Sequence, residues 1–96
     1  MTDKPLLGKT AFISGSGRNI GRAVAVQLAG LGCNVVVNGA TSRADCEATA
    51  ALVEQAGASA SIAMGDMADA DAVADIVKST LDRFGGVDIL INNAAI

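Results

Sequence analysis

A cluster of glycines directly after the first apolar segment restricts the fold of this chain more than any other feature. The segment 9–14 (KTAFIS) is a short run of strand-forming residues, and it is followed at once by Gly15, Gly17 and Gly21. From Gly21 onward the apolar residues have helical spacing. A strand that turns through glycines into a helix is the opening unit of a parallel sheet, because parallel strands need long connections.

Large apolar residues three or four positions apart begin within the glycine cluster and predict a helix that buries one face. The residues of that face are Ile20, Val24, Leu28 and Leu31. We expect the helix to end near Gly30 or Gly32, since glycine readily closes helices. The next segment, 34–38, contains three consecutive valines. This pattern is typical of a strand that is buried on both faces in a parallel sheet.

A second helix and a weaker strand come next. Thr41 or Ser42 can cap the helix, Asp45 lies in its first turn, and Gly57 stands where a closing glycine is expected. The alanine content of this helix predicts close packing. The segment 59–64 then predicts a third strand.

The third helix has the strongest apolar stripe of the chain. Asp69 is its expected N-cap, and Gly85 and Gly86 end it. The stripe consists of Val73, Ile76, Val77, Leu81 and Phe84. The segment 87–91 (VDILI) follows, and it predicts a fourth strand of the fully buried kind.

The resulting βαβαβαβ order predicts an α/β fold, a doubly wound parallel sheet with strand order 3-2-1-4 and right-handed crossovers. A ligand crevice is expected at the carboxyl ends of strands 1 and 4, where the winding reverses. Strand 4 is then an outer edge without a lysine or proline to protect it. We therefore expect further strands beyond Ile96, and residues 1–96 to be an incomplete domain.

Charge and composition exclude several classes of function. The net charge is −3, so the chain has too few basic residues for a nucleic-acid surface. It has neither an apolar run of membrane-spanning length nor a secretory leader, which predicts a cytoplasmic protein with no membrane partner. Cys33 and Cys46, in a chain without histidine, predict buried free thiols and no metal site.

The spacing of the glycine turn distinguishes among nucleotide-binding motifs. Gly15 to Gly21 reads G-x-x-x-N-x-G, which is neither a Walker A loop nor G-x-G-x-x-G. It resembles the TGxxxGxG turn of the short-chain dehydrogenase/reductase family, with Ser14 in place of threonine and Asn19 in place of the middle glycine. Asparagine tolerates left-handed backbone better than most residues, so the local geometry can be kept.

Two further stretches resemble the same family, in particular its 3-oxoacyl-acyl-carrier-protein reductase-like members. They are residues 65–67 (GDM), after the third strand, and residues 92–95 (NNAA), which are similar to the NNAG motif that follows the fourth. The three motifs together cover nearly the whole chain. The resemblance implies a Rossmann fold in which residues 1–96 are the NAD(P)-binding portion.

The motifs assign residues to the parts of a dinucleotide. The amides at the helix start would hold the pyrophosphate, through a turn that comprises Gly15, Ser16, Gly17, Arg18, Asn19, Ile20 and Gly21. The resemblance implies that Asp66 accepts from the adenine amino group and that the Met67 backbone pairs with the ring. It also implies that Asn93, Ala94 and Ala95 line the ribose and nicotinamide, while Asn92 ties strand 4 to its neighbour. The structural alternatives are an ordinary strand-to-helix turn and, for Asp66, a turn or capping aspartate.

The end of the second strand predicts which nicotinamide cofactor is used. An NAD-specific site places a carboxylate there for the ribose hydroxyls, but this chain has Gly39. NADP is therefore the favoured cofactor, with NAD possible. The cation and hydroxyls available for a 2′-phosphate belong to Ser16, Arg18, Thr41, Ser42 and Arg43. The alternative is that both arginines are solvated surface charges and Ser42 is only a helix cap.

The chain has no candidate catalytic residue. The family's chemistry uses a tyrosine that donates the proton, a lysine and a serine, but this chain contains neither tyrosine nor histidine, and Lys78 is expected on a solvated helix face. The favoured hypothesis is the cofactor-binding half of an NADP-dependent oxidoreductase for a carbonyl or alcohol substrate. Its catalytic half, with Tyr-x-x-x-Lys, would follow residue 96 or form a separate polypeptide, and the intact protein would be a homo-oligomer. The alternative is a non-catalytic nucleotide-binding module.

Overall fold

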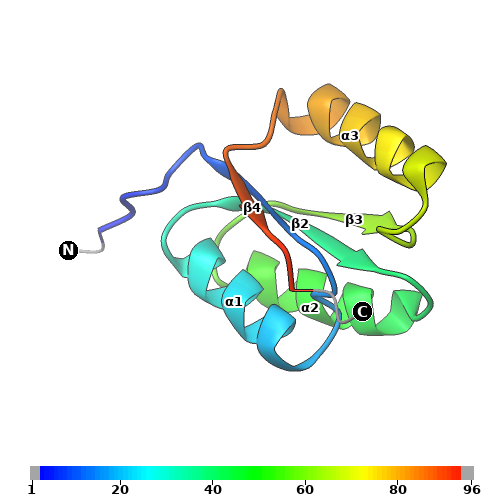
Figure 1. Ribbon diagram of the computed structural model, residues 1–96. Helices are drawn as coiled ribbons and strands as arrows, with labels where there is room; N and C mark the ends of the chain where they lie inside the picture. Colours follow the sequence, from blue (N-terminus) through cyan, green and yellow to red (C-terminus); the bar gives the residue numbers. More distant parts are fainter. Residues whose placement is uncertain (1–2, 94–96) are drawn as a thin grey trace.

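A four-stranded parallel sheet with helices on both faces forms the fold in the computed structural model, which describes residues 3–93 (Figure 1). The elements in chain order are β1 (Thr10–Ile13), α1 (Asn19–Gly30), β2 (Asn34–Gly39), α2 (Arg43–Gln55), β3 (Ala60–Met64), α3 (Ala70–Phe84) and β4 (Ile89–Ile91). The order across the sheet is β3-β2-β1-β4, and Ala11 of β1 pairs with Val35 on one side and Ile89 on the other. The predicted fold class and strand order are confirmed.

Capping residues explain where α2 and α3 begin and end. Ser42 Oγ accepts a hydrogen bond from the Asp45 amide at 3.2 Å, and Asp69 Oδ1 accepts one from the Asp71 amide at 3.0 Å. Gly57 and Gly85 have φ values of 96° and 82°, the left-handed conformation that closes a helix. All four positions match the sequence predictions. Among the described residues, none of the helices has the length and apolarity needed to cross a lipid bilayer.

Two apolar clusters hold the layers together, one on each face of the sheet. The larger cluster lies between the sheet and the helices α1 and α2, and its buried residues are Ala11, Ile13, Ala25, Ala29, Cys33, Val35, Val37, Cys46, Ala50 and Val53. The smaller cluster lies under α3 and contains Phe12, Val36, Ala63 and Ile76. Both cysteines are buried free thiols, as expected, and burial raises the pKa of each.

The predicted buried face of α1 is confirmed for Val24 and Leu28, which are half-buried against the larger cluster, and is wrong for its two end residues. Gly21, Ala25 and Ala29 are buried, whereas Ile20 and Leu31 are 72% and 39% exposed. Gly21 lies so close to the glycine turn that no side chain fits there. Side-chain size therefore decides which residue at the start of α1 faces the turn.

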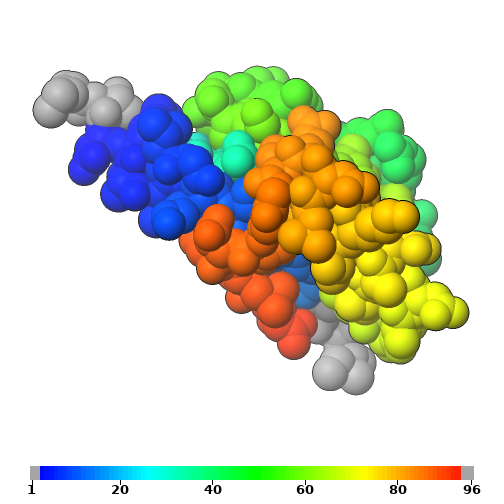
Figure 2. Space-filling view, turned by 90° about the horizontal axis from the view of Figure 1, so that it is seen from above, coloured from blue at the N-terminus to red at the C-terminus, as the bar shows by residue number. Residues whose placement is uncertain are grey.

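The predicted burial of α3 and β4 is also wrong in part. Ile76 and Thr80 are buried, but Val77, Leu81 and Leu90 are 48%, 51% and 70% exposed. Figure 2 looks onto this face, where α3 (yellow to orange) lies beside the red-orange chain of β4. Within the described residues no further layer covers β4, so its outward side chains and the outer part of the α3 stripe line an apolar groove of about 300 Å³.

Candidate functional site

The turn between β1 and α1 has the left-handed backbone that the glycine motif requires. Gly15 has a φ of 60°, and Asn19, at the position of the middle glycine, has a φ of 56°. Asn19 is the one non-glycine residue with positive φ between residues 3 and 93. The asparagine therefore preserves the local geometry, as the sequence analysis expected.

Asn38, at the end of β2, fixes the shape of this turn through hydrogen bonds to its backbone. Its side-chain Oδ1 accepts a hydrogen bond from the Gly15 amide at 3.1 Å, and its carbonyl oxygen accepts one from the Ser16 amide at 2.8 Å. Its Nδ2 donates to the carbonyl oxygens of Ala63 at 2.9 Å and Gly65 at 3.2 Å. Asn38 thus ties together the ends of three strands. Sequence reasoning missed it, although a polar residue after three valines was a visible signal.

Ser16 lies inside this network and not at the surface of the turn. It is fully buried, and its hydroxyl donates to the Ile13 carbonyl at 2.7 Å and accepts from the Asn38 amide at 2.9 Å. The structure therefore does not bring the Ser16 hydroxyl into the ligand cleft. Its role here is to hold the turn.

The end of β4 supports the turn from the other side. Asn93 Nδ2 donates to the Gly15 carbonyl at 3.1 Å, and the Asn93 amide donates to Ser14 Oγ at 2.9 Å. Ser14 Oγ in turn lies 3.3 Å from Asn92 Oδ1, which is the expected side-chain tie between strands 1 and 4. Ala94 and Ala95, which were also predicted to line the site, lie outside the described residues.

Gly21 allows α1 to approach the turn closely. A Cβ at this position would overlap the Gly15 carbonyl oxygen and would lie 2.7 Å from Asn93 Nδ2 and 2.8 Å from Ser16 Cα. Real Cβ atoms essentially never approach neighbours so closely. The glycine is therefore required for packing, the role that the motif predicts for it.

Arg22 locks the turn to α2 and was not predicted from the sequence. Its Nη2 donates to the carbonyl oxygens of Gly17 at 2.6 Å and Asp45 at 3.2 Å, and its Nε donates to Thr49 Oγ1 at 2.9 Å. The sequence offers only a basic residue in the first turn of a helix, which most often is a solvated charge. Here the guanidinium fixes the backbone on both sides of the cleft.

The N-terminus of α1 differs from those of α2 and α3. Within residues 3–93 no side chain caps α1, and its first turn carries no acidic residue, whereas α2 and α3 each have a capping side chain and an aspartate there. The first amides of a helix lack intrahelical acceptors, and the helix dipole makes this end positive. The first amides of α1 are consequently available to an anion.

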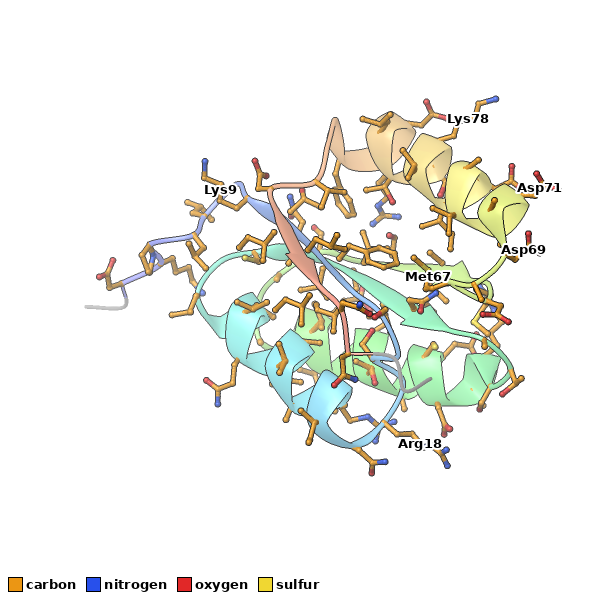
Figure 3. The ribbon with its side chains drawn as sticks, viewed as in Figure 1. Lys9, Arg18, Met67, Asp69, Asp71 and Lys78 are labelled. Carbon is orange, nitrogen blue, oxygen red and sulfur yellow. The ribbon has the colours of Figure 1, made fainter. Side chains whose placement is uncertain are left out.

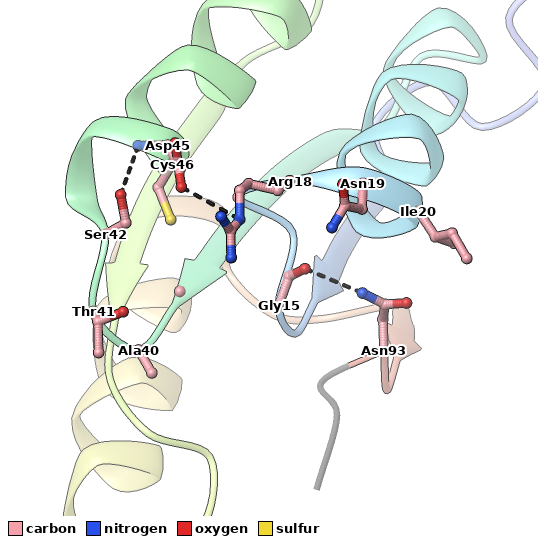
Figure 4. A pocket seen from close by; sticks show the side chains of 12 residues that line it. Gly15, Arg18, Asn19, Ile20, Ala40, Thr41, Ser42, Asp45, Cys46 and Asn93 are labelled. Atoms are coloured by element: carbon pink, nitrogen blue, oxygen red, sulfur yellow. Dashed lines mark hydrogen bonds and ion pairs between the residues drawn. The ribbon is translucent and has the colours of Figure 1, made fainter.

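A cleft of about 350 Å³ opens in front of this helix start (Figure 4). Its lining comes from the glycine turn, the end of β2, the start of α2 and the end of β4: Gly15, Gly17, Arg18, Asn19, Ile20, Gly39, Ala40, Thr41, Ser42, Asp45, Cys46 and Asn93. Most of the predicted phosphate-site residues therefore do meet. Arg43 is not among the lining residues; its Nε lies 3.7 Å from Glu47 Oε2 on the exposed side of α2.

A second hollow, of about 660 Å³, continues along the carboxyl edge of the sheet and shares Gly15 and Ala40 with the first. It contains Asp66 and Met67, which were predicted to contact adenine. The Asp66 Oδ1 accepts a hydrogen bond from the Ala68 amide at 2.9 Å, so the carboxylate also shapes its own turn. The two hollows together form a trough from Asp66 to Arg18, open at the point where the winding of the sheet reverses.

Gly39 and Cys46 form the floor of the first cleft. A Cβ on Gly39 would lie 2.5 Å from Cys46 Sγ, so a strand-end carboxylate does not fit here unless the thiol moves. Burial raises the pKa of Cys46, the carboxylate of Asp45 raises it further, and two arginines oppose the effect. The thiol therefore stays protonated and acts as a packing group.

Elsewhere in the described chain, two charged side chains of α3 point away from the sheet. Figure 3 shows Lys78 and Asp71 on the outer face of α3, whereas Arg18 extends from the glycine turn. Lys78 is exposed, as the sequence analysis expected. The sequence offers neither a tyrosine nor a histidine to this site.

Comparisons with known proteins agree with this geometry. A family model described as short chain dehydrogenase matches residues 9–96. The 3-oxoacyl-(acyl-carrier-protein) reductase FabG of Staphylococcus aureus is 40% identical over 88 residues, which are 92% of this chain and 36% of the relative. The 3-oxoacyl-(acyl-carrier-protein) reductase of Synechocystis is 40% identical over 95% of this chain and 37% of its own length.

Solved structures show the same relationship. A short-chain dehydrogenase/reductase from Serratia marcescens superposes with a TM-score of 0.90 at 40% identity, covering 96% of this chain and 38% of that one. A hydroxysteroid dehydrogenase from Escherichia coli superposes with a TM-score of 0.88 at 30% identity, covering 95% of this chain and 38% of the dehydrogenase. The chain thus spans little more than a third of the relatives that it matches. Because the family model covers residues 9–96, the chain belongs to the short-chain dehydrogenase family.

Proposed function

We propose that this chain is the cofactor-binding half of an NADP(H)-dependent oxidoreductase that interconverts a carbonyl and an alcohol. The observation that carries the proposal is the uncapped start of α1, which opens into the trough formed by the two hollows. The family and the carbonyl reductases among its relatives support the reaction class. When bound, the nicotinamide supplies or accepts the hydride.

The pyrophosphate would lie against the first amides of α1. Asn38 and Arg22 hold the turn from two sides, so the amides are oriented before any ligand arrives. Such preorganisation lowers the entropic cost of binding. Asp66 and Met67 would then meet the adenine at one end of the trough, and Asn93 would lie toward the nicotinamide side.

The preference for NADP rests on the charges at the first cleft. The end of β2 carries Gly39 in a space already filled by the Cys46 thiol, so no carboxylate there repels a 2′-phosphate. Arg18 lines the cleft with a side chain that is 71% exposed, and the hydroxyl residues Thr41 and Ser42 line it too. A guanidinium and hydroxyls suit a phosphate dianion.

The chain's own residues bind and orient the cofactor, and the proton donor must come from outside residues 3–93. No tyrosine or histidine is present in the sequence. We propose that the catalytic tyrosine and lysine belong to the remainder of the oxidoreductase, together with the substrate pocket and the surfaces of a homo-oligomer. The partners of this chain would then be that remainder and a small carbonyl or alcohol substrate.

Titration of the purified protein with NADP⁺ and with NAD⁺, by calorimetry, tests the proposal. The unmodified protein is expected to bind NADP⁺ more tightly. Arg18→Ala should weaken NADP⁺ binding by about tenfold or more and NAD⁺ binding far less, because a charge-assisted bond to phosphate is worth about 1.5–3 kcal/mol. Lys78→Ala, which removes a cation from the far face of α3, is the matched control and should change neither affinity. Equal weakening of both cofactors by Arg18→Ala would contradict the NADP assignment.

A further inference from the structure

The first cleft has one charge of each sign. Of its lining residues, Arg18 and Asp45 are the charged ones, and Arg18 Nε lies 3.5 Å from Asp45 Oδ2 (Figure 4). Arg18 comes from the glycine turn and Asp45 from the first turn of α2, so the ion pair spans the cleft. The cation that suits a 2′-phosphate is thus already paired with a carboxylate.

The two partners differ in how firmly the fold holds them. The Asp45 amide donates to Ser42 Oγ at 3.2 Å, and its carbonyl oxygen accepts from Arg22 Nη2 at 3.2 Å and Thr49 Oγ1 at 3.3 Å. The side chain of Asp45 is 36% exposed, against 71% for Arg18. A ligand can therefore redirect the long Arg18 side chain easily, but it cannot move the backbone that carries the carboxylate.

We propose that Asp45 is the residue that limits discrimination between the 2′-phosphorylated and the unphosphorylated cofactor. This inference rests on the proposed function, in which Arg18 faces the 2′-position. A 2′-phosphate must take Arg18 from Asp45 and then lie near the carboxylate that this fixed backbone carries, whereas an unphosphorylated ribose carries no charge for Asp45 to repel. Asp45 therefore lowers the ratio of NADP⁺ affinity to NAD⁺ affinity. Without its charge, Gly39 and Arg18 would give a higher ratio.

Asp45→Asn tests the inference because it removes the charge and keeps the side-chain size. The affinity for NADP⁺ is expected to rise by about threefold to tenfold, since one weak ion pair and one repulsion are lost, while NAD⁺ affinity stays the same or falls. Glu54→Gln is the matched control. It makes the same charge change on the same helix, about 13 Å further along its axis, and should leave both affinities unchanged.

A double-mutant cycle identifies the route through Arg18. In the Arg18→Ala background, Asp45→Asn is expected to raise NADP⁺ affinity by less than in the unmodified protein, because no cation remains to be released. Adenosine 2′,5′-bisphosphate and adenosine 5′-monophosphate, used as separate probes, should repeat the contrast without the nicotinamide. Circular dichroism melting checks that each variant is folded.

The outcomes separate this inference from the proposal on which it rests. If the unmodified protein prefers NADP⁺, Arg18→Ala abolishes the preference, and Asp45→Asn leaves the ratio of the two affinities unchanged, the role of Asp45 is overturned and the NADP assignment stands. If the unmodified protein binds neither dinucleotide, both are overturned. A rise in NADP⁺ affinity that is equal in the Asp45→Asn and Glu54→Gln variants would also overturn the role of Asp45, since it would reflect net charge alone.

Discussion

Replacing Gly21 by alanine separates packing against the glycine turn from ordinary helix propensity. The added methyl group would lie 2.7 Å from Asn93 Nδ2 and 2.8 Å from Ser16 Cα, and it would also overlap the Gly15 carbonyl oxygen. Carbon atoms in contact prefer about 3.5–4.0 Å, so the first turn of α1 must move away by roughly 1 Å. That movement displaces the amides proposed to hold the pyrophosphate.

The magnitude follows from two opposing effects. Overpacking of this kind costs about 1–3 kcal/mol, while alanine gains about 1 kcal/mol over glycine inside a helix. We expect the free energy of unfolding to fall by about 1 kcal/mol and dinucleotide affinity to fall by about tenfold or more. The higher helix propensity of alanine offsets part of the loss in stability. It does not return the amides to their positions, so the dinucleotide affinity falls by more than the stability.

Gly30→Ala is the matched control at the other end of the same helix. Nothing lies within 4 Å of a Cβ built at Gly30, so this variant should gain about 0.5 kcal/mol in stability and bind normally. Urea unfolding followed by circular dichroism gives the stabilities, and the fluorescence of NADPH gives the affinities. If the two alanine variants behaved alike in both assays, close packing of α1 on the turn would be refuted as the reason for Gly21.

Three further predictions concern the supports of the site. Asn38→Ala leaves the Gly15 amide and two strand-end carbonyls without their partner, so urea unfolding should show a loss of about 3 kcal/mol; a loss below about 1 kcal/mol would contradict its supporting role. Gly39→Asp should lower the melting temperature more in the unmodified background than together with Cys46→Ala, because the thiol occupies the space of the new Cβ; equal losses would show that the contact does not matter. Burial raises the pKa of Cys33 and Cys46 above the ordinary 9.0, so both thiols ionise less readily in the folded state than in the unfolded state. The free energy of unfolding is therefore unaffected by these thiols below about pH 9. Above that pH it falls by up to about 1.4 kcal/mol per pH unit for each thiol. Cys33→Ala should make this alkaline decline shallower in a pH series of unfolding curves, and an unaltered slope would argue against it.

The order and ends of the elements were predictable because they depend on local signals. Ser42, Asp69, Gly57 and Gly85 act at helix ends through bonds to their own neighbours, and the three valines of β2 mark a strand buried on both faces. Strand order then followed from the alternation of elements. These features need no knowledge of distant contacts.

Features that depend on distant contacts were not predictable in the same way. Ile20 looked like a core residue, but it is exposed because Gly21 is the residue of this helix turn that faces the glycine turn. Arg22 and Asn38 have roles that exist only once α2 and β3 are in place. Leu90 was expected to be buried on both sides, yet the described residues provide no layer over it.

The central claim is that the first amides of α1 donate hydrogen bonds to the phosphates of a nicotinamide dinucleotide. Amide chemical-shift mapping by NMR during titration with NADPH tests this claim directly. We predict saturable shifts that are largest for the amides of residues 17–20, with smaller ones at 39–42 and 66–67. Saturable binding whose largest shifts lay elsewhere, such as the apolar groove beside α3, or no binding at all, would contradict the claim.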